Sequence, residues 1–159
     1  MIAPAAEPAF YGKRIPTRTF RDRLTASGTL ACGAGPVHAL IGFFNAATVN
    51  EWRTPNTVAI RVQGRGDRFF AYVEYATARW RAGGDEPRPF APMRDPRSGK
   101  LEPRGFAARG AVHRWSLDYD PEAAGGRGAI VATIDGETSV CELAAGHKGY
   151  RPDSCGNIR

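Results

Sequence analysis

The stretch TVAIRVQGRGDRFFAYVEY, residues 57–75, decides the fold, because apolar residues recur at every second position on both sides of a glycine-rich turn. This period of two is that of a β-strand with one buried face. Two glycines in Gly64-Arg65-Gly66-Asp67 supply backbone angles that other residues avoid, so we place a turn there. The register that follows sets three apolar pairs opposite each other: Val62 and Phe69, Ile60 and Ala71, Val58 and Val73.

A second hairpin is predicted around Asp135-Gly136, a dipeptide typical of type I′ turns. Pairing outward from it joins Thr133 with Thr138, Val131 with Val140, and Ile130 with Cys141. Alternating residues predict another half-buried strand at 114–120, with Trp115 in the core, and further strands at 24–32 and 38–45. Residues 40–44 are apolar at both parities, which predicts a central strand covered on both faces.

The domain organisation follows from length and from the strand pattern. A chain of 159 residues has the size of one domain, and no segment repeats apolar residues at helical spacing. We therefore expect an all-β protein whose antiparallel strands form a two-sheet β-sandwich at residues 19–148, with a weakly ordered lead-in at 1–18 and an irregular tail at 149–159. The long stretch 82–111 is either a functional surface loop or contains a short hairpin around residues 95–99.

Charge and composition exclude several classes of function. The formal net charge is +6, but the basic residues are scattered, so we expect no nucleic-acid partner and keep sulfated or uronic-acid polymers open. No stretch approaches the roughly 20 apolar residues of a membrane span, and no signal peptide is visible. Three histidines and three cysteines lack metal-ligand spacing, so we expect no metal and no cofactor, and the disulfide status of the cysteines stays open: Cys32, Cys141 and Cys155.

Several strings resemble uncharacterised bacterial domains of the concanavalin A-like lectin and glucanase (LamG-like) group: residues 24–29, 42–45, 52–56, 113–121 and 132–136. The resemblance implies a jelly-roll sandwich in an exported or envelope-associated bacterial protein. Members of the wider group bind or cut polysaccharides, and activity does not follow from fold. Such domains continue with a closing strand, whereas residues 149–155 are polar and rich in turn formers. We therefore expect a shortened sandwich.

The candidate binding site is the non-core face of the first hairpin. Tyr72 and Trp80 offer flat rings, and Arg61 and Glu74 offer charged hydrogen-bonding groups beside them. Sugars need this mixture, because they present C–H faces and hydroxyl edges. The rim of the site is predicted to hold three further residues: Trp52, Arg53 and Asn56. The alternative is that this face packs under the loop at 82–111, with Phe70 as its anchor.

The sequence contains no complete catalytic signature. Retaining glycosidases need two carboxylates about 5 Å apart, and the Glu-x-Asp-x-x-Glu strand of the related glucanases is absent. Asp118 and Asp120 come nearest, but Asp120 before a proline is typical of a turn. We name no catalytic residue. Three hypotheses remain: a non-catalytic carbohydrate-binding or adhesion-type module, a polysaccharide hydrolase or lyase that uses Glu74 or the Asp118 and Asp120 pair, and a structural remnant without ligand.

Overall fold

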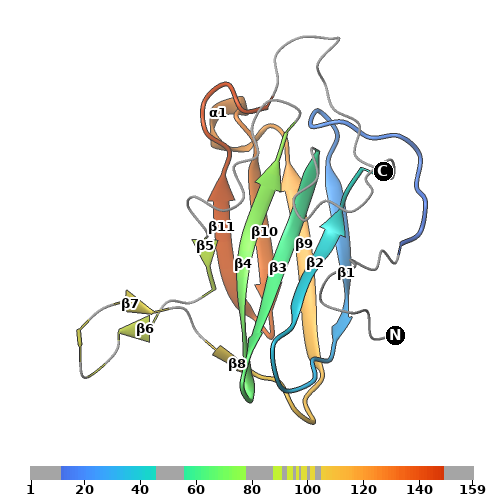
Figure 1. Cartoon of the computed structure of the whole chain (residues 1–159). Helices are drawn as coiled ribbons and strands as arrows, with labels where there is room; N and C mark the ends of the chain where they lie inside the picture. Colours follow the sequence, from blue (N-terminus) through green and yellow to red (C-terminus); the bar gives the residue numbers. More distant parts are fainter. Residues whose placement is uncertain are drawn as a thin grey trace.

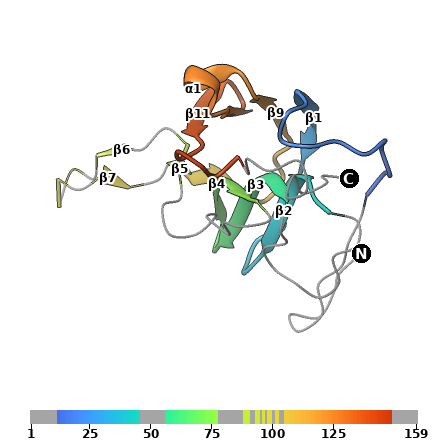
Figure 2. The ribbon, with the colours of Figure 1, turned by 90° about the horizontal axis from the view of Figure 1, so that it is seen from above.

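The computed structural model describes residues 12–45, 56–77, 88–90, 93–94, 96, 98–99, 101–102 and 105–148. Over these residues the chain is an all-β sandwich of two antiparallel sheets (Figures 1 and 2). The first sheet has the order β1-β9-β10-β11, with bounds Leu24–Leu30, His113–Asp120, Ala129–Ile134 and Glu137–Glu142. The second has the order β2-β3-β4-β5, with bounds His38–Phe43, Thr57–Arg65, Arg68–Ala76 and Arg88–Pro89, and β8 (Gly105–Ala107) also pairs with β4.

The chain crosses between the layers twice. It begins in the first sheet with β1, builds the second sheet with β2, β3, β4, β5 and β8, and returns with β9, which lies between β1 and β10. The strand β1 therefore pairs with a strand far along the sequence, with Leu24 opposite Tyr119 and Leu30 opposite His113. A four-residue helical turn, α1 (Ala123–Gly126), joins β9 to β10.

The register of the first hairpin differs from the prediction by two residues. The turn holds only Gly66 and Asp67, so Val62 lies opposite Ala71 and Ile60 opposite Val73. Gly64 belongs to β3, because the chain at 35–37 lies against it: a Cβ atom there would stand 2.5 Å from the carbonyl oxygen of Gly35. The predicted faces are nevertheless correct, since a shift of two preserves parity.

The second hairpin matches its prediction in full. Thr133 pairs with Thr138, and Ile130 pairs with Cys141. Asp135 and Gly136 have φ values of 51° and 83°, the two positive angles of a type I′ turn. The short hairpin in the long stretch is also confirmed, because β6 (Met93–Arg94) pairs with β7 (Leu101–Glu102) and lies outside the two layers (Figure 2).

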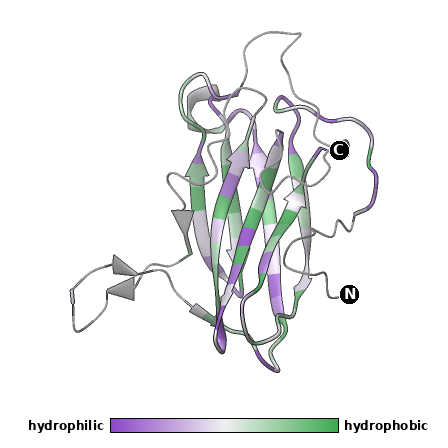
Figure 3. Cartoon of the chain, viewed as in Figure 1, coloured by the Kyte–Doolittle hydropathy of each residue, from purple (hydrophilic) through white to green (hydrophobic). Residues whose placement is uncertain are grey.

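The core lies between the two sheets. Hydrophobic and hydrophilic residues alternate along the strands (Figure 3), and the largest fully buried side chains come from both layers: Phe20, Val58, Ile60, Val62, Phe69, Phe90, Leu117, Tyr119, Ile130, Ile134 and Leu143. Close packing between the sheets is visible at Gly42, where a Cβ atom would stand 2.9 Å from Cδ2 of Leu117.

The position of β2 corrects a prediction. The sequence predicts a central strand at residues 40–44, but β2 lies at the end of the strand order of the second sheet, and His38 is exposed while residues 39–43 are half-buried. Ala39, Ile41 and Phe43 pack against the core, and Leu40 lies on the other face. A run of residues that is apolar at both parities can thus also indicate an edge strand whose outer face is half-buried. Within the described ranges, no helix is long and apolar enough to cross a membrane.

Candidate functional site

The outward face of the second sheet holds the predicted cluster of Arg61, Tyr72 and Glu74. Register places Arg61 opposite Tyr72 and Glu74 one pair further along, opposite Ala59. Nε of Arg61 lies 2.7 Å from Oε1 of Glu74, and its guanidinium carbon lies 4.6 Å from the centre of the Tyr72 ring. The guanidinium is thus held by a carboxylate and by an aromatic face at once.

This outward face is closed at one end and open at the other. Glu74 is only 3% exposed, and Ala59 and Ala76 beside it are as deeply buried. Toward the turn, the side chain of Arg61 is 15% exposed, and Tyr72 and Phe70 are half-buried. Glu74 therefore holds Arg61 in position from the buried end of this face and offers little surface to a ligand.

Cross-strand pairing extends the open part over three strands. His38, Gln63 and Phe70 form one row, and Leu40, Arg61 and Tyr72 form the next. Arg65 and Arg68 pair at the end of the hairpin, and both are exposed. We call these eight residues the Tyr72 face: His38, Leu40, Arg61, Gln63, Arg65, Arg68, Phe70 and Tyr72.

The charge of the Tyr72 face is positive. Three of its eight members are arginines, and the one carboxylate on the outward strand positions described, Glu74, is buried against Arg61. Phe70 lies beside Gly105 of β8, where a Cβ atom would stand 3.2 Å from its ring. The arrangement offers aromatic surface, an amide and guanidinium groups on one side of a rigid sheet.

The other predicted site residues fall elsewhere. Asn56 is predicted at the rim, but it is 5% exposed and has a φ of 64°, so its side chain is enclosed in this structure. Trp52, Arg53 and Trp80 lie outside the described residues. Of the seven predicted contacts, Arg61, Tyr72 and Glu74 are brought together. Sequence reasoning placed Phe70 on this face but gave it a role only as an anchor in the alternative interpretation. It missed four further residues, although strand parity was the signal that could have found them: His38, Gln63, Arg65 and Arg68.

The carboxylates considered for catalysis have structural partners. Asp118 faces the guanidinium of Arg23, with two N···O distances of 3.3 Å, and Asp120 accepts the backbone N–H of Glu122 at 2.9 Å. Hydrogen bonding to Asp118 and the nearby charges of Asp118 and Asp120 raise the pKa of Arg23. Asp118 thus belongs to an ion pair, and Asp120 stabilises a turn.

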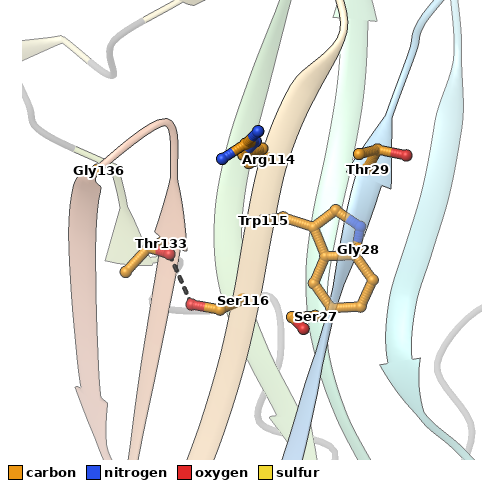
Figure 4. A pocket seen from close by; sticks show the side chains of 8 residues that line it. All are labelled: Ser27, Gly28, Thr29, Arg114, Trp115, Ser116, Thr133 and Gly136. Atoms are coloured by element: carbon orange, nitrogen blue, oxygen red, sulfur yellow. Dashed lines mark hydrogen bonds between the residues drawn. The ribbon is translucent and has the colours of Figure 1, made fainter.

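A hollow of about 440 Å³ lies on the first sheet and was not predicted (Figure 4). Its lining is rich in hydroxyl groups and includes the predicted core residue Trp115, which is half-buried and packs against the core: Ser27, Gly28, Thr29, Arg114, Trp115, Ser116, Thr133 and Gly136. The hydroxyls of Ser116 and Thr133 are 2.6 Å apart. The indole lies against Gly28, where a Cβ atom would stand 3.2 Å from Nε1. The hollow is wide and shallow, and it lacks a described carboxylate.

The remaining reactive side chains are held within the fold. Nδ1 of His113 lies 2.6 Å from Asp135, and its Nε2 lies 2.7 Å from the carbonyl oxygen of Ala107. Cys141 is buried and Cys32 is half-buried, and burial raises the pKa of Cys32. Among the described residues, no group of three His, Cys, Asp or Glu side chains is arranged to hold a metal ion.

Comparisons of the chain with protein-family models, with curated proteins and with solved structures find no match.

Proposed function

We propose that this chain is a non-catalytic carbohydrate-binding module that takes an acidic polysaccharide on the Tyr72 face. The observation that carries the proposal is the half-buried pair Phe70 and Tyr72 beside a guanidinium that Glu74 and Tyr72 hold in place. Rings of this kind cover the C–H faces of sugars, and neighbouring donors bind their hydroxyl or acidic groups.

Charge favours an acidic ligand over a neutral one. Arg65 and Arg68 are exposed at the open end of the Tyr72 face, and the chain carries a formal net charge of +6. Guanidinium groups bind carboxylate and sulfate groups through paired hydrogen bonds. Uronic-acid or sulfated polymers fit this pattern. The resemblance to concanavalin A-like domains of exported bacterial proteins implies a polysaccharide ligand and leaves its charge open.

A hydrolase or lyase is the weaker alternative. Glu74 is buried against Arg61, Asp118 is paired with Arg23, and Asp120 accepts the backbone N–H of Glu122, so each carboxylate has a structural partner. Glycoside hydrolysis requires instead a pair of carboxylates that flank the substrate. Incubation with the bound polymer is expected to leave its chain length unchanged. Shortening of the polymer that Glu74→Gln or Asp118→Asn abolishes would instead support an enzyme.

Binding to soluble polysaccharides tests the proposal. The full chain is titrated with polygalacturonate, with a sulfated polymer, with neutral dextran and with single-stranded DNA. We expect acidic glycans to bind more tightly than dextran or DNA, and Tyr72→Ala to weaken that binding about tenfold, which corresponds to roughly 1.4 kcal/mol. Replacing Arg65 and Arg68 by Ala should weaken binding and reduce its dependence on salt.

Arg114→Ala is the matched control, because Arg114 is an exposed arginine on the other sheet. It is expected to leave binding unchanged, and circular dichroism checks that each variant is folded. Tighter binding to DNA would assign the face to nucleic acid. Loss of binding only in Arg114→Ala would move the site to the hollow on the first sheet, and no binding to any polymer would favour a structural remnant without ligand.

A further inference from the structure

Among the described strands, β1 is an edge strand of the first sheet. It ends the order of the first sheet and pairs with β9 on one side (Figure 1). Its sequence, LTASGTL, holds no charged residue and no proline, and Thr25, Ser27, Gly28 and Thr29 are exposed. Edge strands usually carry a charge, a proline or a bulge that prevents pairing with another chain, so an edge without them is suited to pair.

The opposite edge of the same sheet is built differently. The strand β11, ETSVCE, has a glutamate at each end. If two copies of β11 paired about their centre, Glu137 would lie opposite Glu142, and residues of the core face would lie opposite residues of the outer face. Symmetric pairing about the centre of the strand is therefore disfavoured at β11, whereas at β1 the central pairing keeps each face.

The sequence of β1 is nearly a palindrome about Ser27. An antiparallel partner strand of the same sequence, centred on Ser27, would bring like residues together: Leu24 with Leu30, Thr25 with Thr29, Ala26 with Gly28, and Ser27 with its own copy. Each pair has matching parity. Leucine, alanine and glycine would thus remain on the core face, and the hydroxyl residues would remain on the outer face.

We propose that β1 pairs antiparallel with β1 of a second copy of this chain, about a two-fold axis at Ser27. The product is one continuous sheet of eight strands, in which β1 of each copy becomes an inner strand. Such a contact is self-complementary, as two-fold symmetry requires, and the new backbone hydrogen bonds satisfy groups that otherwise face water. Ser27, Gly28 and Thr29 also line the hollow in Figure 4, so the two hollows would flank the axis.

Charge at the axis gives the sharpest test. Because Ser27 is exposed and its side chain is on the outer face, Ser27→Lys is expected to leave the fold of one copy intact while it sets two like charges opposite each other. By analytical ultracentrifugation the unmodified chain should dimerise, and Ser27→Lys and Ser27→Asp should each raise the dimer dissociation constant at least tenfold. An equimolar mixture of the two variants should restore the dimer as a heterodimer.

Thr138→Lys is the matched control, because Thr138 is exposed on β11 and belongs to the same cross-strand row through Ser116 and Thr133. It is expected to leave the dimer unchanged. Ser27→Cys should form an intermolecular disulfide under mild oxidation faster than Thr138→Cys. A chain that stays monomeric at about 0.5 mM overturns the proposal, and so does a dimer that Thr138→Lys breaks and Ser27→Lys does not. Unfolding curves of each variant distinguish a lost contact from a lost fold.

Discussion

At the scale of single residues, the ion pair between Arg61 and Glu74 decides how the Tyr72 face is held. Glu74 is 3% exposed and its oxygen lies 2.7 Å from Arg61, so removal of the carboxylate leaves a largely buried guanidinium without its counter-charge. Loss of one partner from a buried pair typically costs about 3–5 kcal/mol. We therefore expect Glu74→Ala to lower the free energy of unfolding by about 3 kcal/mol in urea titrations.

The exposed ion pair of Arg23 and Asp118 provides the control. Their side chains are 64% and 40% exposed, so Asp118→Ala should cost less than about 1 kcal/mol. Replacing both Arg61 and Glu74 by apolar residues should cost less than Glu74→Ala alone, since no charge is then left buried. Equal costs for Glu74→Ala and Asp118→Ala would contradict this role.

A second residue-scale prediction concerns acid stability at the tip of the second hairpin. The hydrogen bond with His113, followed by the backbone N–H of Arg114, lowers the pKa of Asp135 below its ordinary value of 3.8. A lowered pKa in the folded state stabilises the fold fully above the ordinary value, and this contribution is lost as the pH falls through the folded-state value. Asp135→Asn should therefore flatten the dependence of unfolding free energy on pH in this acidic range. An unchanged acid limb would show that Asp135 makes no such contribution.

At the scale of elements, the turns determine the registers of the hairpins. Substituting a turn glycine distinguishes the cost of backbone strain from the cost of a steric clash. Gly136 has a φ of 83°, and a Cβ atom added there would meet no other atom within 4 Å, so its substitution acts through backbone strain alone. Gly136→Ala should cost about 1 kcal/mol. Gly33 has equal space and no positive φ, so Gly33→Ala should be neutral or slightly stabilising. Thermal unfolding measures both, and equal effects would contradict the assigned turn.

The two hairpins show what sequence can predict about elements. Asp135-Gly136 fixes its register because the dipeptide allows only a short turn with two positive φ angles. Residues 64–67 contain two glycines, and the sequence alone does not tell which of them lies in the turn between the strands. Gly64 is needed for the close approach of residues 35–37, a contact between distant segments that no local pattern reveals. The predicted register was wrong by two residues, and a shift of two preserves parity. The faces were therefore predicted correctly, whereas the opposing residues were not.

At the scale of the whole molecule, stability depends on the interior between the sheets. Leu117 is 1% exposed and lies against Gly42 of the other sheet, so Leu117→Ala should leave a cavity and cost about 2–5 kcal/mol. Val131 lies on the neighbouring strand but faces outward and is 39% exposed. Val131→Ala should cost less than about 1 kcal/mol. A small difference between the two variants, measured in urea, would contradict the two-layer core.

The candidate site was only partly accessible to sequence reasoning. Alternation placed Arg61, Tyr72 and Glu74 on one face, and the register then brought them together. Burial along that face was not predictable, because it depends on what covers the far end of a strand. The contribution of β2 was also missed, since its apolar run indicated a strand covered on both sides, whereas His38 is exposed and residues 39–43 are half-buried.

The central claim is that the Tyr72 face binds an acidic glycan. It is tested most directly by titrating the ¹⁵N-labelled chain with an oligogalacturonate and following backbone amide chemical shifts. The account predicts saturable shifts at Gln63, Phe70 and Tyr72, with no change at Ser116 and Thr133 on the other sheet. Shifts confined to the first sheet, or none at millimolar ligand, would contradict it.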